Sequence, residues 1–288
     1  MKNRGITTSK IKNNAPAIPV LVWVGFFAGV PLVFVLVISF LTRDSLGIIV
    51  LEFSTENYRR IFEPVYLKIF FNSFLLAGLT GVVTLVIGYP VAYITSKLKG
   101  RQRTLTIGLI MLPFWISSLL RTYGWRILLD YKGIINNILT GLGITNEPVT
   151  MLGTFAASLV GTAYMLIPFM IIAVFNSVDK LDRSLLEASY DLGAGKLKTF
   201  RNITLRLTLP GIAGGFTLVF IPALGLFFIS DILGGGQTVY LGNKINELIG
   251  RGRNKPLAAA MSVAMVLFIT LVIYIYTKVS KEEVGGLL

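Results

Sequence analysis

Two residue types that serve most enzyme and metal sites are missing from this chain. Its 288 residues include no cysteine and no histidine. Without cysteine there is no disulfide framework, no thiol nucleophile and no cysteine-ligated metal. Without histidine, the commonest general base and the commonest metal ligand are absent as well. We therefore expect a protein that is not an enzyme, with no catalytic residue, no metal site and no cofactor bound by this chain.

Charged residues are also scarce in this chain. Charged residues make up 14% of the chain, against about a quarter in a typical soluble domain, and the mean hydropathy is +0.74. Six long stretches carry no Asp, Glu, Lys or Arg: 13–42, 69–96, 104–120, 148–178, 207–230 and 256–277. A helix of about 20 apolar residues spans a bilayer, and five of the six exceed that length. The third is marginal at 17 residues and needs Arg121 to snorkel or the helix to tilt little.

This pattern predicts an all-α integral membrane protein that forms a single domain over residues 1–288. We read the first span as a retained helix, because its apolar core is too long for a signal peptide. The predicted transmembrane helices cover approximately 18–41, 69–96, 104–125, 153–177, 208–230 and 257–277.

The charges that remain are unevenly divided between the two membrane faces. Sixteen of the 27 basic residues fall on the face that holds both termini, and the short loop 97–103 carries four cations and no anion. By the positive-inside rule this face is cytoplasmic. We therefore expect a multi-pass protein of a bacterial inner membrane with both termini in the cytoplasm, and no nucleic-acid partner despite a net charge of +13.

The segment 179–206 is a charged, glycine-punctuated cytoplasmic loop in this topology. Leu181, Leu185, Ala188 and Leu192 recur at spacings of four, three and four, which predicts a short helix with one apolar stripe. Either Asp179 or Asp182 is suited to cap its start, and Gly193 or Gly195 to close its end. The second part places Leu197, Phe200, Ile203 and Leu207 on one face of a second short helix, with Pro210 and Gly211 at the start of the fifth span.

Amphipathicity alone leaves two readings of this loop open. It is consistent with an interfacial helix lying on lipid headgroups, and equally with a knob that docks on another protein. Nucleotide binding is excluded, because the stretch "GAGKLKT" has Tyr190 and Leu197 where a phosphate loop needs Gly and Ser or Thr.

The same residues resemble a motif of the inner-membrane permeases of binding-protein-dependent ABC importers, whose cytoplasmic loop has the form EAA-x3-G-x9-I-x-L-P. Glu187 and Ala188 match its start, and Gly193, Ile203 and Leu205 follow at the required offsets. Ser189 stands in place of the second alanine. Arg206 stands in place of the proline, so that Pro210 is expected to supply the local bend.

The resemblance extends over nearly the whole chain and is greatest to the polyamine branch, the spermidine/putrescine permeases of the B type. It implies a type I ABC importer permease fold with six transmembrane helices. It also implies that the loop 179–206 is a coupling element that seats in a separate ATPase subunit, with Gly193 allowing its turn. The residues assigned to this role are Leu181, Leu185, Glu187, Ala188, Leu192, Gly193, Ile203 and Leu205.

The partners that the resemblance implies are a cytoplasmic ATPase subunit, expected as a dimer, a second related permease and a periplasmic substrate-binding protein, in addition to membrane lipid. The ATP would be consumed by the partner subunit. Because a polyamine is a long organic cation, its path needs acidic groups and aromatic faces. The candidates are Trp115, Tyr123, Tyr164 and Asp231, although interfacial anchoring or a structural role remains open for each.

Two alternatives remain. One is a permease for another small solute, such as iron, phosphonate or sulfate, because these permeases share much of the scaffold. The other is a self-sufficient secondary transporter or channel. That class usually shows internal repeats or charges within the membrane, and neither is evident in the sequence.

Overall fold

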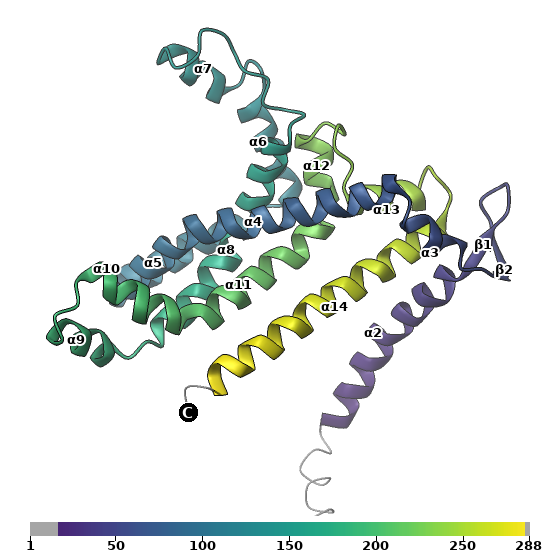
Figure 1. The fold of residues 1–288 in the computed structure, drawn as a ribbon. Helices are drawn as coiled ribbons and strands as arrows, with labels where there is room; N and C mark the ends of the chain where they lie inside the picture. Colours follow the sequence, from purple (N-terminus) through teal and green to yellow (C-terminus); the bar gives the residue numbers. More distant parts are fainter. Residues whose placement is uncertain (1–16, 286–288) are drawn as a thin grey trace, which may run out of the picture. The chain divides into compact units, whose positions relative to one another are not determined.

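The computed structural model describes residues 17–285 and, apart from one hairpin, its regular structure is helical (Figure 1). Five of its helices are long and apolar enough to cross a membrane, and a bent pair of shorter helices adds a sixth crossing if it counts as one span. The predicted all-α membrane fold is thus confirmed. The described residues form two compact units, one of residues up to 63 with 247–268 and one of 64–246 with the residues from 269 onward. The single domain over 1–288 stays a prediction.

The first unit begins with α2 (Ala17–Ser39), which covers nearly all of the first predicted span. The antiparallel strands β1 (Leu41–Arg43) and β2 (Ile49–Phe53) and the short helix α3 (Glu56–Ile61) follow it. The side-chain amide of Asn57 donates to the carbonyl oxygens of Ser39 at 3.1 Å and Leu41 at 2.9 Å. These two bonds hold α3 against the point where α2 ends.

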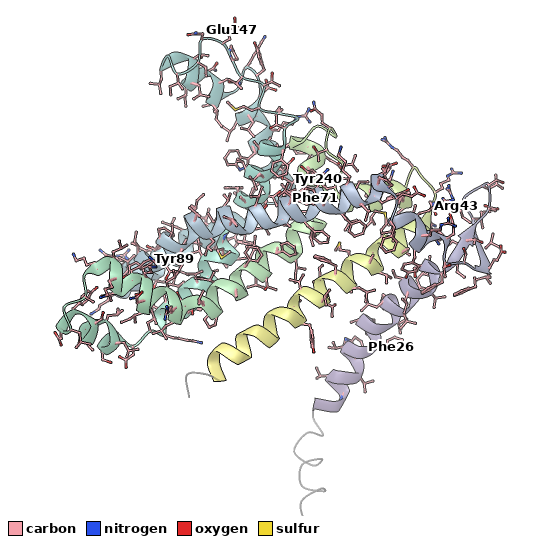
Figure 2. All side chains as sticks on the ribbon, viewed as in Figure 1. Phe26, Arg43, Phe71, Tyr89, Glu147 and Tyr240 are labelled. Carbon is pink, nitrogen blue, oxygen red and sulfur yellow. The ribbon has the colours of Figure 1, made fainter. Side chains whose placement is uncertain are left out.

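A second contact in this unit joins residues more than 200 positions apart. The guanidinium of Arg43, labelled in Figure 2, donates to the carbonyl oxygens of Gly252 at 2.9 Å and Arg253 at 3.2 Å. These carbonyls belong to the turn that precedes α14 (Lys255–Gly285), which contains the sixth predicted span. The hairpin is thereby fastened to the start of the last helix.

Three long helices form the core of the second unit. Figure 1 shows α4 (Pro64–Lys97), α8 (Phe155–Asp179) and α11 (Leu205–Gly225) running side by side. Small residues allow this close packing: a Cβ on Gly215 of α11 would lie 2.7 Å from the Sδ of Met170 and 3.1 Å from the Cβ of Ala173 on α8. The second predicted span lies within α4, which begins five residues earlier, and the fourth agrees with α8 to within two residues at each end.

Hydroxyl groups inside these helices are mostly satisfied by their own backbone. Thr80 donates to the Leu76 carbonyl at 2.7 Å, and Thr84 donates to the Thr80 carbonyl at 2.8 Å. Such bonds make a polar side chain tolerable in an apolar environment. One hydroxyl pair instead links two helices, because the Tyr89 and Thr208 oxygens of α4 and α11 lie 3.0 Å apart (Figure 2 labels Tyr89).

The third predicted span, 104–125, is not one straight helix. The chain forms α5 (Gly100–Met111), the 3₁₀ turn η1 (Leu112–Trp115) and then α6 (Ser118–Leu129), followed by α7 (Ile134–Gly141). The two halves are bent by 92° at the break. Pro113 explains the position, because a proline inside a helix removes a backbone donor and clashes with the preceding turn.

The fifth predicted span also differs from the structure at both ends. A continuous helical segment of 30 residues runs from Lys196 to Gly225 through α10 (Lys196–Thr199), the π-helical turn η2 (Phe200–Thr204) and α11. The second short helix predicted in the loop is therefore the first part of the span itself, and the helix does not begin at Pro210. At its other end the predicted span continues past a break at Leu226 into α12 (Phe227–Leu233), which α13 (Leu241–Ile249) follows.

Candidate functional site

The loop 179–206 forms a knob built on α9 (Arg183–Asp191), at one end of the three core helices (Figure 1). Asp182 caps this helix: its carboxylate accepts a hydrogen bond from the backbone N–H of Ser184 at 2.9 Å. That bond lowers the pKa of the Asp182 carboxyl below its usual value. Of the two caps left open by the sequence, the structure selects Asp182, because Asp179 ends α8 and pairs with Arg103 instead.

The predicted apolar stripe faces away from the rest of the chain. Leu185 and Ala188 are exposed, Leu192 is 89% exposed, and only Leu181 is half-buried. Glu187 is exposed on the same helix. Exposed leucines on a surface helix favour contact with another surface, since a partner would remove that apolar area from water.

A pair of hydroxyl groups fixes α9 to the chain. The oxygens of Ser189 and Thr199 lie 2.9 Å apart, and both residues are buried. Thr199 belongs to α10, so this bond joins the two arms of the knob across ten residues. The pattern of the sequence did not predict this bond, although a serine at a motif position that otherwise holds alanine is a signal for an added hydrogen bond.

Gly193 makes the turn between the arms. Its φ of +79° lies in the left-handed region that favours glycine. The N–H of Gly193 donates to the Tyr190 carbonyl at 2.9 Å, and the N–H of Ala194 donates to the Ser189 carbonyl at 3.0 Å. These bonds close the C-terminal end of α9, as expected from the position of the glycine.

The other two motif residues have a different place. Ile203 and Leu205 are half-buried on the segment that continues into α11. On the same segment Phe200 meets the rings of Tyr89 and Tyr93 of α4 edge-on, with centroids 5.6 and 5.9 Å apart. The structure thus places Ile203 and Leu205 on the base of the knob and not on its exposed stripe.

A cavity of about 410 Å³ lies where the knob meets the core. Its lining includes Tyr93 and Lys97 of α4 and Leu181, Glu187 and Tyr190 at the knob. The Lys97 ammonium stands 4.0 Å from the centre of the Tyr93 ring. The ion pair of Arg103 and Asp179, at 2.7 Å, joins α5 to the end of α8 beside this cavity.

The four residues assigned to a substrate path lie on four different elements, η1, α6, α8 and α12. Trp115 ends the turn η1 and is 89% exposed. Tyr164 of α8 packs edge-on against Trp125 of α6, with centroids 5.5 Å apart. Tyr123 lines a concavity at the end of α6, and the lining of that concavity includes none of the other three.

Asp231 lies on α12 and is exposed. It is hydrogen-bonded to Asn243, a neighbour that the sequence did not indicate. The side-chain amide of Asn243 donates both to the Asp231 carboxylate and, at 3.1 Å, to the carbonyl of Phe227. The hydroxyl of Ser230 donates to the amide oxygen of Asn243 at 2.9 Å. One carboxylate oxygen of Asp231 is thus fixed within a small network between α12 and α13.

Arg121 is half-buried next to the break between α5 and α6. Its Nε and Nη1 atoms are buried and have no hydrogen-bond partner among the described residues. Its guanidinium carbon lies 5.6 Å from the centre of the Phe114 ring, which brings a cation to the inner side of the break between α5 and α6. Within residues 17–285 no group of His, Cys, Asp or Glu side chains has the arrangement of a metal site.

The sequence model of one protein family, described as "Binding-protein-dependent transport system inner membrane component", matches residues 13–282. Among individual proteins, the spermidine/putrescine transport system permease protein PotB of Haemophilus influenzae is 39% identical over 259 residues, which are 90% of this chain and 91% of that protein.

Solved structures agree with the fold. A bacterial ABC transporter involved in the import of the acidic polysaccharide alginate matches with a TM-score of 0.73 at 17% identity, over 95% of this chain and 98% of that one. The alginate transporter in complex with a pentasaccharide-bound periplasmic protein matches with a TM-score of 0.72 at 17% identity, over 94% and 96% of the two chains. At this identity the likeness shows the fold alone, the type I ABC importer permease fold that the sequence predicted.

Proposed function

This chain belongs to the family of binding-protein-dependent transport system inner membrane components, and from that membership we propose that it is the permease subunit of an ABC importer for polyamines such as spermidine and putrescine. The family is one of transport components of the inner membrane, which agrees with a multi-pass protein rich in apolar helices. ATP would be hydrolysed by a separate ATPase subunit.

The observation that carries the proposal is the exposed stripe of the knob. Leu185, Ala188 and Leu192 present apolar surface at the end of the core helices, on a short helix that the Ser189–Thr199 pair joins to α10. A rigid element with an unpartnered apolar face is suited to transmit a movement of another subunit to the core helices. Differential contact of this face in two states of the ATPase would shift the permease between inward- and outward-open forms.

The remaining partners follow from the family and from the topology. A second related permease would complete the path, and a periplasmic binding protein would deliver the substrate on the opposite face. Both termini and the loop 179–206 would lie in the cytoplasm, in accordance with the excess of cations on that face. The N-terminal cations counted for this orientation lie outside the described residues.

Asp231 is the residue we assign to the polyamine itself. Its carboxylate is exposed and oriented by Asn243, so that it is free to meet an ammonium group at little further entropic cost. Trp115 offers an exposed ring for contact with the cation or its methylene spacers. Tyr123 lies on α6 of the same broken element, and Tyr164 of α8 packs against Trp125 of α6. An acidic residue in the path would favour a polyamine cation over phosphonate or sulfate, which are anions.

The coupling is tested with the importer purified from its host through a tag on this chain. We expect Leu192→Glu to abolish retention of the ATPase subunit and ATP-driven spermidine uptake in proteoliposomes, because it places a charge in the apolar contact. Leu142→Glu is the matched control, since Leu142 is 70% exposed at the end of α7. Full uptake by Leu192→Glu, or robust uptake by this chain without an ATPase, would contradict the proposal.

The substrate assignment has its own test. We expect Asp231→Asn to raise the spermidine concentration needed for half-maximal uptake while the ATPase stays bound. Unchanged uptake at normal membrane levels would remove Asp231 from the path. Asp130→Asn is the control, because Asp130 is also an exposed acid after a membrane helix.

A further inference from the structure

A second concave surface lies on the α10 arm of the knob, at the start of the long helical segment that becomes α11. It has a volume of about 670 Å³ and is lined by residues of α10, η2 and the first turn of α11. Four of its seven lining residues are cations, namely Lys196, Lys198, Arg201 and Arg206. Gly195, Leu197 and Asn202 complete the lining, so the surface contains no acidic group.

None of these four cations is paired within the described part of the chain. Arg103, at the same end of the core helices, forms an ion pair with Asp179 at 2.7 Å, but no carboxylate stands within ion-pair distance of the four. Cations gathered around one hollow repel each other unless an anion lies among them. The arrangement therefore calls for an anionic group that the chain does not supply.

The position along the helix indicates where that anion comes from. The helical segment of 30 residues from Lys196 to Gly225 is about 45 Å long, which exceeds the hydrocarbon thickness of about 30 Å. Its charge-free part begins at Leu207, directly after Arg206. At about 1.5 Å per residue, Arg206 and Arg201 fall within roughly 8 Å of the hydrocarbon boundary, at the depth of lipid phosphates.

We propose that this concavity binds the phosphate headgroup of an anionic phospholipid of the cytoplasmic leaflet. The proposal rests on the orientation proposed above for the leaflet, whereas the binding itself rests on the four cations. Guanidinium groups bind phosphate through paired N–H donors, and the amide of Asn202 adds a further donor. Leu197, which is 80% exposed at the rim, can lie along the lipid.

A lipid is favoured over an acidic protein surface because of the geometry of the two arms. The surface suited to a protein partner is the apolar stripe of α9, whereas the cations lie on the arm that runs directly into the membrane helix. A headgroup bound there would hold the base of the knob at the membrane surface. The base would then stay in place while the exposed stripe moves.

The test compares lipid retention by the full chain in nanodiscs that contain equal amounts of phosphatidylglycerol and phosphatidylcholine. The lipids that remain bound after stepwise release are counted by native mass spectrometry. The variant is the triple substitution Lys198→Gln, Arg201→Gln and Arg206→Gln. Its matched control is Lys68→Gln, Arg126→Gln and Lys132→Gln, which removes three cations outside this surface.

We expect the unaltered chain and the control to retain phosphatidylglycerol in preference to phosphatidylcholine. The triple variant should lose that preference by about a hundredfold, at roughly fivefold for each cation near the membrane surface. A charge-preserving variant, Lys198→Arg with Arg201→Lys and Arg206→Lys, should keep it and so separates lost charge from lost folding. Inorganic phosphate at millimolar concentration should not displace the lipid.

Equal retention by the triple variant and the unaltered chain overturns the proposal, as does an equal loss in the control. So does displacement by inorganic phosphate, or loss of the ATPase subunit from the triple variant while its lipid stays bound. Because both leaflets of a nanodisc have the same composition, the lipid result depends neither on orientation nor on transport. Failure of spermidine uptake would therefore contradict the proposed function only. The lipid proposal would still be decided by the lipid measurement.

Discussion

At Gly193 the backbone, and not the available space, restricts which residue can be accommodated. Its φ is +79°, while a Cβ at this position would meet nothing within 4 Å. For most residues with a Cβ, this backbone conformation costs about 1–2 kcal/mol, and the cost depends little on the size of the side chain. Asparagine tolerates the left-handed region better than other side chains. The requirement for glycine is thus a property of the turn itself.

We therefore expect Gly193→Ala and Gly193→Leu to lower ATP-driven uptake by similar, severalfold factors, and Gly193→Asn to lower it less. The measurement is uptake per reconstituted importer in vesicles. A loss that grows steeply from alanine to leucine would contradict this account, because it would show that a partner surface sets the limit. Undiminished uptake by Gly193→Leu would count against the coupling role of the turn.

The hydroxyl pair of Ser189 and Thr199 determines how rigidly the two arms of the knob are joined. Removing either hydroxyl leaves the other buried without its partner, at a cost of about 1–3 kcal/mol. We expect Ser189→Ala and Thr199→Val each to speed amide hydrogen exchange in α9, and the double variant to add little to either. Asp191→Asn, at an exposed position of the same helix, is the control. Strictly additive effects would show that the two hydroxyls act separately.

At the scale of elements, the contact of α8 and α11 depends on which glycine of α11 faces its neighbour. A Cβ on Gly215 would press on Met170 and Ala173, whereas a Cβ on Gly214 would meet nothing within 4 Å. We expect Gly215→Leu to destabilise the bundle by about 1–3 kcal/mol through overpacking. Gly214→Leu should be neutral or slightly stabilising, because glycine is a poor helix former. Thermal unfolding in detergent measures both, and equal effects would contradict the packing.

The helices also show where the local sequence is sufficient to predict a membrane span and where it is not. The charge-free runs predicted four of the six spans closely, since a bilayer demands long apolar helices wherever they lie in the chain. Pro113 broke the third predicted span, yet helices α4, α8 and α11 run through Pro90, Pro168 and Pro210 without ending. Whether a proline ends a helix depends on neighbours that re-satisfy the freed backbone groups, and single-sequence reasoning has no access to those neighbours.

At the scale of the whole molecule, the orientation in the membrane is the prediction with the widest consequences. The chain has no cysteine, so a single introduced cysteine can be labelled without background. We expect a membrane-impermeant maleimide to label Glu147→Cys in intact spheroplasts and Leu192→Cys only after permeabilisation. Both sites are exposed, and Figure 2 places Glu147 beyond α7. Labelling of Leu192→Cys from outside would reverse the topology and remove the knob from the reach of a cytoplasmic ATPase.

The sequence by itself determined the membrane class and the helices α2, α4, α8 and α14, and it narrowed the cap of the knob to Asp179 or Asp182 and its closing glycine to Gly193 or Gly195. Each of these depends on residues close together in the chain, through hydropathy, capping or backbone conformation. Only the tertiary structure decided that Ser189 meets Thr199, that Asn243 orients Asp231, and that four cations surround one hollow. The first two are distances between side chains on different elements. The hollow depends on how α10 continues through η2 into α11, and charge spacing along the chain does not reveal that continuity.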